Sequence, residues 1–205
     1  TSLTGITAHA HCLEAVESAV TLCREMGHEV CDESPRISDV EAVTDAFGKI
    51  FVISAALHLR VLESAAGHPA RDDEVEPLTR AVVSLARRVS GIDYVLAQRT
   101  LQRMTREIAR FHDSFDLLLC PTIALPPPLI GELCFQPDDA IEVFFAKAGA
   151  YGSFTSVFNA TGQPAMSVPL HWTPLGLPIG VQFAARLGDE SSLFRLAAEL
   201  ERARP

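Results

Sequence analysis

The chain has 205 residues, is 48% hydrophobic, and carries 17 basic against 26 acidic residues, a formal net charge of −9. This length suits one domain or part of one, and the acidic balance argues against nucleic acid and anionic membrane as partners. No apolar run approaches the roughly 20 residues that span a bilayer, and the first residues lack the basic and apolar regions of a signal peptide. We therefore expect a cytoplasmic protein that contacts neither nucleic acid nor membrane.

Five cysteines, at positions 12, 23, 31, 120 and 134, lack a paired spacing such as C-x-x-C. An odd number without that spacing favours reduced thiols over a disulfide framework or a zinc site. Core packing is the expected role of Cys12, Cys23 and Cys120, because they fall in apolar segments. The chain also lacks G-x-S-x-G, P-loop and G-x-G-x-x-G motifs.

Residues 1–33 are predicted to form an αβ unit. Apolar residues recur at helical spacing at Leu13, Val16, Val20 and Cys23, and Gly27 ends the helix. Residues 28–32 then suit a short strand.

Residues 38–115 are predicted to be helical. Ser38 with Glu41 suits a capping box at the start of a long helix, and Ser90 with Asp93 repeats the pattern before a later one. The predicted buried face of the first long helix consists of Val43, Phe47, Ile50, Ser54, Leu57 and Val61.

Residues 116–205 are predicted to contain a sheet and a closing helix. Residues 117–120 are wholly apolar, which is typical of a central strand in a parallel sheet. Thr122 follows this strand, and ligands of open α/β sheets collect beyond the carboxyl ends of strands. Thr122 is therefore a candidate pocket residue, and ordinary turn capping is the alternative.

The stretch from Tyr151 to Ala185 is almost uncharged. It suits a short helix that Gly162 ends, followed by two strands, and Pro169 inside the first strand indicates an edge, a bulge or a strand end. An amphipathic helix is expected over residues 137–148, and a closing helix over 193–200. The predicted fold class is α/β, a mixed sheet flanked by helices with an antiparallel addition at the C-terminal end.

The segment FNATGQPAMSVPL, followed by GLPIGVQFAARLGDESSLFRLAAELE, resembles the C-terminal signature region of the amidase signature family, the Ser-Ser-Lys amide hydrolases. The upstream segments DLLLCPTIALPPPLIGE and GHEV fit the same family. The resemblance implies a small-molecule amide substrate, cleavage of its C–N bond through a serine acyl-enzyme, and no metal or organic cofactor.

The family's Gly-Gly-Ser-Ser-Gly-Gly-Ser segment and its upstream Lys do not occur in this sequence. The resemblance therefore implies that residues 1–205 are the C-terminal portion of a single amidase domain, in which no catalytic residue can be assigned. We expect this chain alone to be inactive, to pair with the missing N-terminal half, and without that half to aggregate or form a homo-oligomer. A non-catalytic binding or scaffold chain that uses the same half of the fold is the alternative.

Thr155, Phe158 and Gly162 lie at positions i, i+3 and i+7, and share one face while the helix lasts. The resemblance implies that this face lines an acyl-binding cavity. These three residues and Thr122 are the predicted substrate-pocket residues. For Phe158, simple core packing is the alternative.

Overall fold

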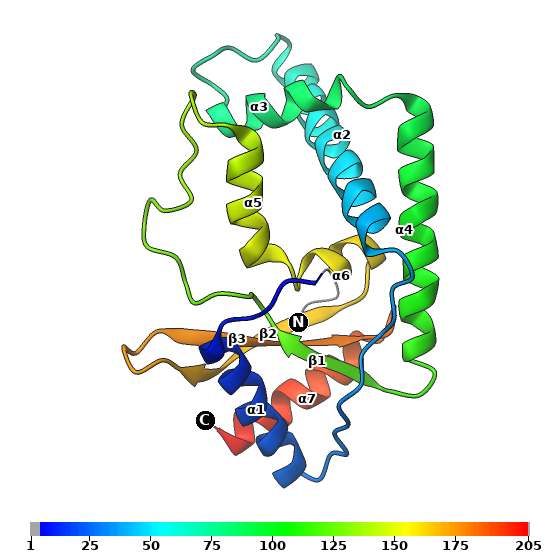
Figure 1. The fold of residues 1–205 in the computed structure, drawn as a ribbon, viewed down its shortest axis with the longest axis vertical. Coiled ribbons are helices and arrows are strands. Elements are labelled where there is room, and N and C mark those ends of the chain that lie inside the picture. The colour runs from blue at the N-terminus through cyan, green and yellow to red at the C-terminus, as the bar shows by residue number, and fades with distance from the viewer. Residues whose placement is uncertain (1–4, 205) are drawn as a thin grey trace.

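The structure, a computed structural model, describes residues 5–204 (Figure 1). Residues 1–4 of the predicted αβ unit therefore lie outside the described part. The elements, in chain order, are α1 (Ala10–Glu25), α2 (Val40–Ala66), α3 (Pro77–Ala86), α4 (Gly91–Phe111), β1 (Leu117–Pro121), α5 (Ile141–Gly152), α6 (Ser156–Thr161), β2 (Ala165–Trp172), β3 (Pro178–Ala185) and α7 (Glu190–Ala203). The predicted α/β class is confirmed.

The sheet has three strands in the order β1-β3-β2, and both pairings are antiparallel. Leu119 of β1 and Met166 of β2 both lie opposite Phe183 of the middle strand. The register of β2 shifts between Pro169 and His171, on an outer strand, as the proline predicted. A proline is tolerated there because an outer strand can leave one backbone position unpaired.

The two faces of the sheet are covered by different helices. On one face, Val181 and Phe183 share a core cluster with Cys12 of α1 and Leu196 of α7. On the other face, the buried residues Leu118, Phe158 and Ala184 cluster together. Figure 1 shows the layers, with α1 and α7 on one side of the sheet and the α2–α5 layer on the other.

Helices α2 and α4 pack together and form the centre of the helical layer. Full burial of a side chain such as Ile108 or Met104 contributes about 1.5–3 kcal/mol relative to exposure. Ser90 and Asp93 form the predicted capping box of α4. Two orphan backbone donors are thereby satisfied at the start of this helix.

The predicted capping box of the first long helix is wrong. Helix α2 begins at Val40, and Asp39 caps it by accepting a hydrogen bond from the Ala42 amide at 3.0 Å. The Ser38 hydroxyl instead donates to Glu107 Oε1 at 2.6 Å, which ties the start of α2 to α4. A carboxylate on a packed neighbouring helix therefore takes the hydroxyl that the local pattern assigned to Glu41.

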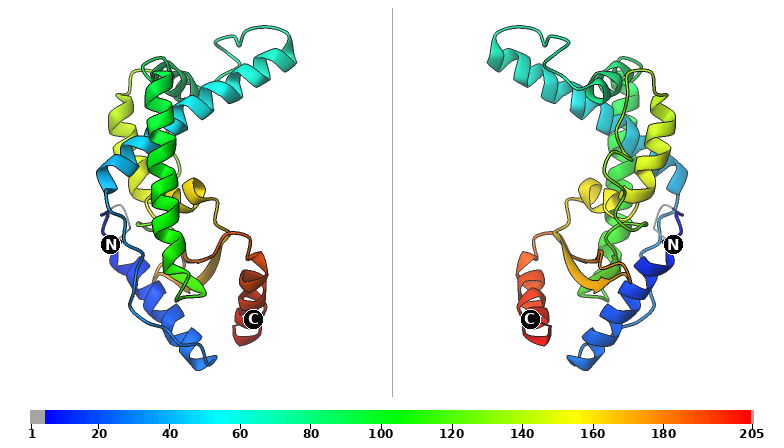
Figure 2. Two further views of the ribbon diagram at one scale, coloured as in Figure 1. Left: turned by 90° about the vertical axis from the view of Figure 1, so that its right-hand side faces the viewer. Right: turned by 90° about the vertical axis from the view of Figure 1, so that its left-hand side faces the viewer.

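The C-terminal part of α2 projects from the body with the following loop, as Figure 2 shows in cyan. Leu57 and Val61 were predicted to lie on the buried face, but they are exposed. The helix outruns its partner there, because α3 covers α2 around Val52 and Ala56. Helical periodicity identified the stripe but not the length over which a partner covers it.

Three further expectations are corrected. Residues 28–32 form no strand, and the Val30 carbonyl accepts a hydrogen bond from the Arg24 side chain instead of from a neighbouring strand. Strand β1 is an outer, antiparallel strand within the described residues, not a central strand of a parallel sheet. The helix expected at 137–148 starts later, at Ile141, because the Asp139 carboxylate accepts from the Gln136 amide and holds a turn there.

Candidate functional site: an apolar cleft

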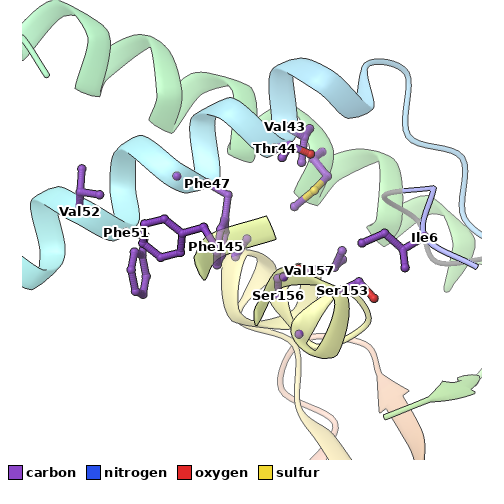
Figure 3. A pocket seen from close by; sticks show the side chains of 15 residues that line it. Ile6, Val43, Thr44, Phe47, Phe51, Val52, Phe145, Ser153, Ser156 and Val157 are labelled. Atoms are coloured by element: carbon purple, nitrogen blue, oxygen red, sulfur yellow. The ribbon is translucent and has the colours of Figure 1, made fainter. Parts of the chain in front are cut away.

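A cleft of about 500 Å³ lies between α2, α5 and α6 (Figure 3). Helix α2 contributes Phe47 and Phe51, and α5 contributes Phe145. The rings of Phe51 and Phe145 meet edge to face, with centroids 6.1 Å apart and planes at 86°. This geometry is favourable for two aromatic rings and fixes one wall of the cleft.

Helical spacing explains how these residues come to line one space. Val43, Phe47 and Phe51 follow one another at intervals of four on α2. Phe145, Gly149 and Gly152 follow at intervals of four and three on α5. Residues three and four apart share a helix face, so each helix presents one continuous strip to the cleft.

None of the fifteen described residues that line the cleft carries a charge. The hydroxyl of Thr44 donates to the Val40 carbonyl at 2.9 Å, and that of Ser153 donates to the Ala150 carbonyl at 3.3 Å. Both hydroxyl protons are therefore taken by nearby backbone carbonyls, and the neutral hydroxyl of Ser156 is the third on the cleft wall. The cleft offers hydrocarbon surface rather than an anchor for a charged ligand.

Neither lysine is placed as a catalytic base, which must be neutral to accept a proton. Lys49 donates to Asp45 Oδ2 at 2.6 Å, and this hydrogen bond raises the pKa of its ammonium group above the ordinary value. Lys147 donates to the Glu132 carbonyl at 2.7 Å and lies 3.6 Å from the Glu132 carboxylate. Both side chains are thus engaged with oxygen acceptors on the protein.

None of the five cysteines lines the cleft. Burial raises the pKa of the Cys120 thiol to about 11, and it also raises the pKa of Cys12 and Cys23. A raised pKa keeps these thiols protonated and unreactive at neutral pH. The buried positions of Cys12 and Cys23 confirm their predicted place in the core.

Comparison with known proteins decides the family. The family described as "Amidase" matches residues 1–194. The chain belongs to the amidase family.

Two curated relatives of this amidase chain are 6-aminohexanoate-cyclic-dimer hydrolases. The protein from Paenarthrobacter ureafaciens is 30% identical over 199 residues, which cover 95% of this chain and 40% of the relative. The protein from Pseudomonas sp. (strain NK87) is 29% identical with the same coverage. The amidase chain thus spans about 40% of the length of these curated relatives.

Solved structures agree with this assignment. A structure of 6-aminohexanoate cyclic dimer hydrolase has a TM-score of 0.88 and 28% identity, covering all of the amidase chain and 44% of the solved one. A bacterial aryl acylamidase of the amidase signature family has a TM-score of 0.77 at 19% identity, covering 100% of this chain and 43% of the other. The second likeness concerns the fold alone.

The four predicted pocket residues of the amidase chain lie beside the cleft or away from it, and none lines it. Thr155 precedes α6, and its hydroxyl donates to the Gly152 carbonyl at 3.1 Å. Phe158 is 5% exposed in the core against the sheet, and Gly162 ends α6 with a φ of +73°. Thr122 is hydrogen-bonded to Ser167 on the sheet.

The helix α6 that was predicted to face a pocket does so through other residues. Ser156, Val157 and Ala160 line the cleft, while Phe158 packs toward Leu118 and Ala184. Successive residues of an α-helix point about 100° apart, so Val157 faces the cleft while its neighbour Phe158 faces the sheet. The assignment of Thr122, Thr155, Phe158 and Gly162 to substrate binding stays a prediction.

Sequence reasoning missed the residues that α2 and α5 contribute to the cleft of the amidase. Phe47 was placed on the buried face of α2, and Gly48, Phe51, Phe145 and Gly149 were assigned no role. A signal was present, since two helices each carried phenylalanine and glycine on a shared strip. Recognising it requires knowledge that α2 and α5, about 100 residues apart, lie across the same space.

The described residues provide neither a metal site nor a membrane-spanning helix. Among residues 5–204, no group of three or more His, Cys, Asp or Glu side chains is arranged to hold a metal ion. In the same part of the chain, no helix combines the length and apolar character needed to cross a bilayer.

Proposed function

We propose that this chain is the C-terminal part of an amidase that hydrolyses a carboxamide C–N bond through a serine acyl-enzyme. The family match carries the proposal, and the uncharged cleft supports it as the place where part of a neutral amide binds. The catalytic Ser-Ser-Lys set would come from a segment outside these residues. That N-terminal half is therefore the proposed partner of this chain.

The proposed reaction has two balanced steps. The serine oxygen attacks the carbonyl carbon, the lysine takes the serine proton, and the C–N bond breaks as the amine leaves with a proton returned through the second serine. Water then attacks the acyl-serine ester, which releases the carboxylic acid and restores the serine hydroxyl. The amide carbon is neither oxidised nor reduced, so no redox cofactor takes part.

The described residues support an external source for this machinery. Lys49 and Lys147 both donate hydrogen bonds to oxygen atoms, those of Asp45 and Glu132. A general base needs a lowered pKa, and the pKa of Lys49 is raised. We accordingly propose that this chain alone has no amidase activity.

The experiment compares this chain with a protein that also contains the upstream segment of its gene. We expect turnover of hexanoyl-p-nitroanilide and covalent labelling by a fluorophosphonate only in the longer protein. Lys49→Ala and Lys147→Ala in the longer protein serve as controls and should retain activity. Serine labelling together with turnover by this chain alone would contradict the proposal.

We also propose a cytoplasmic location. The supporting observation is that the five cysteines are all free thiols in the structure. Fractionation of cells that express the protein from its own gene tests this proposal. Recovery in an oxidising compartment with paired cysteines would contradict it.

A further inference from the structure

Two glycines within helices line the apolar cleft without a steric need for glycine in this chain. Gly48 lies in α2 and Gly149 in α5, and an added Cβ at either position would meet no heavy atom within 4 Å. Both residues have ordinary backbone conformations, since neither is among the glycines with positive φ. Glycine weakens a helix interior relative to alanine, so helix stability disfavours glycine at positions 48 and 149.

The space beside these glycines has a defined chemistry. Phe47, Phe51 and Phe145 supply aromatic walls. The hydroxyls of Thr44 and Ser153 donate to nearby backbone carbonyls, which leaves the neutral hydroxyl of Ser156 as the remaining polar side-chain group on the wall. A charged group placed in the cleft would lose hydration without gaining a charged partner. A hydrocarbon group has no such hydration to lose, and it would gain contact with the aromatic rings.

The size of the space limits what can enter it. A volume of about 500 Å³ lies within the range of about 300–1,000 Å³ typical of small-molecule sites. Gly48 and Gly149 stand on two different walls, α2 and α5. A side chain at either position would therefore remove volume from the cleft while leaving the aromatic walls in place.

We infer that the cleft binds an uncharged hydrocarbon group adjacent to the scissile amide, and that Gly48 and Gly149 set the largest group it accepts. This inference rests on the proposed amidase function and narrows its substrate class to amides with a neutral aliphatic or aromatic substituent on one side. Amides that carry a charge at the far end of that substituent are poor substrates. Gly48 and Gly149 act as specificity-determining residues and take no part in bond breaking.

The test uses the protein that includes the upstream segment, with Gly48→Leu, Gly149→Leu and a matched control. Gly91→Leu is the control, because Gly91 also lies in a helix, has open space at its Cβ and does not line the cleft. Thermal melting confirms that each variant is folded. Gly48→Ala and Gly149→Ala provide milder changes if a leucine variant does not fold.

Two substrate series locate the hydrocarbon group. One contains acetyl, butyryl, hexanoyl and octanoyl p-nitroanilides, with adipoyl p-nitroanilide as the charged counterpart of hexanoyl. The other contains acetamides of methyl, butyl, hexyl and octyl amines. A chain-length preference in the first series assigns the group to the acyl side, and one in the second series assigns it to the amine side.

If the group lies on the acyl side, we expect kcat/KM for hexanoyl p-nitroanilide to exceed that for adipoyl p-nitroanilide by about tenfold or more. If it lies on the amine side, we expect the same excess for the acetamide of hexylamine over that of methylamine. An apolar pocket achieves discrimination of this size. Gly48→Leu and Gly149→Leu should lower the ratio of long-chain to short-chain kcat/KM by about tenfold, and Gly91→Leu should leave it unchanged. Equal ratios in all variants, or a preference for adipoyl, would overturn the inference.

A binding measurement separates this inference from the proposed function. Saturation-transfer NMR with hexanamide and adipamate as probes requires no turnover. If no amide is hydrolysed but hexanamide binds and Gly48→Leu abolishes that binding, the amidase proposal fails while the hydrocarbon site stands. Hydrolysis without any effect of the leucine variants on hexanamide binding would overturn the site alone.

Discussion

The hydroxyl oxygen of Thr122, the residue that follows β1, lies 2.6 Å from the hydroxyl oxygen of Ser167 on β2. The two side chains meet over Gly180 of β3, the strand between them. A Cβ added at Gly180 would lie 2.7 Å from the Ser167 oxygen and 2.8 Å from the Thr122 oxygen. Glycine therefore allows one hydrogen bond to join the two outer strands across the middle one.

Gly180→Ala should disturb this arrangement and lower the free energy of unfolding by about 1–3 kcal/mol, the usual cost of overpacking. The reason is that the methyl group would force both hydroxyls aside and break the bond between them. Denaturant unfolding of the protein that includes the upstream segment measures the effect. Gly91→Ala is the control, since its methyl group enters open space. Equal stabilities of the two variants would refute the steric account.

Phe158 and Phe51 form a matched pair for separating core packing from ligand binding. Phe158 is 5% exposed and packs against the sheet, whereas Phe51 is 46% exposed in the cleft. Phe158→Ala should lower the free energy of unfolding by about 3–5 kcal/mol, typical of truncating a core phenylalanine. Phe51→Ala should lower the free energy of unfolding far less. It should alter the chain-length preference of the protein that includes the upstream segment. The sequence analysis placed Phe158 in the substrate pocket, with core packing as the alternative. A larger effect of Phe158→Ala on chain-length preference than on the free energy of unfolding would favour the pocket, and the opposite result would favour the core.

Glu107 predicts how stability changes with pH. The Ser38 hydroxyl and amide both donate to its carboxylate, and these hydrogen bonds hold its pKa below the ordinary value. A carboxyl with a lowered folded-state pKa stabilises the protein above its unfolded pKa of about 4.3, and this contribution is lost as pH falls through the folded pKa. We expect the melting temperature to fall between about pH 5 and pH 3, and to fall less steeply in Glu107→Gln. The solvent-exposed Glu201→Gln serves as the control. Parallel pH profiles for wild type and Glu107→Gln would show that the Ser38 contact does not contribute.

Features set by neighbouring residues in the sequence were predicted well. The capping box of Ser90 and Asp93, the stop at Gly162 and the irregularity at Pro169 all depend on backbone groups within a few residues. The family resemblance was also correct, because the signature segment fixes several spacings at once.

Features that depend on distant partners were predicted less well. Residues 28–32 have strand-like composition, but a strand requires a neighbour, and the Arg24 side chain takes the Val30 carbonyl. Ser38 binds Glu107, which lies 69 residues away, and not the local Glu41. The cleft is the extreme case, since Gly48 and Gly149 acquire a role only when α2 and α5 face each other.

The free edge of β1 leads to the last prediction, which concerns association. Within the described residues β1 pairs with β3 on one side, and no strand pairs with its other side. Its backbone donors and acceptors on that side, next to the apolar Leu117, Leu118 and Leu119, can template pairing with another strand. We expect this chain alone to aggregate or to form oligomers at micromolar concentration, and to become a defined complex when the upstream segment is present. Sedimentation velocity with and without that segment measures both states. A compact monomer that melts cooperatively and ignores the upstream segment would refute this prediction. It would also favour the non-catalytic binding or scaffold alternative, because a self-sufficient fold has no need of the catalytic half.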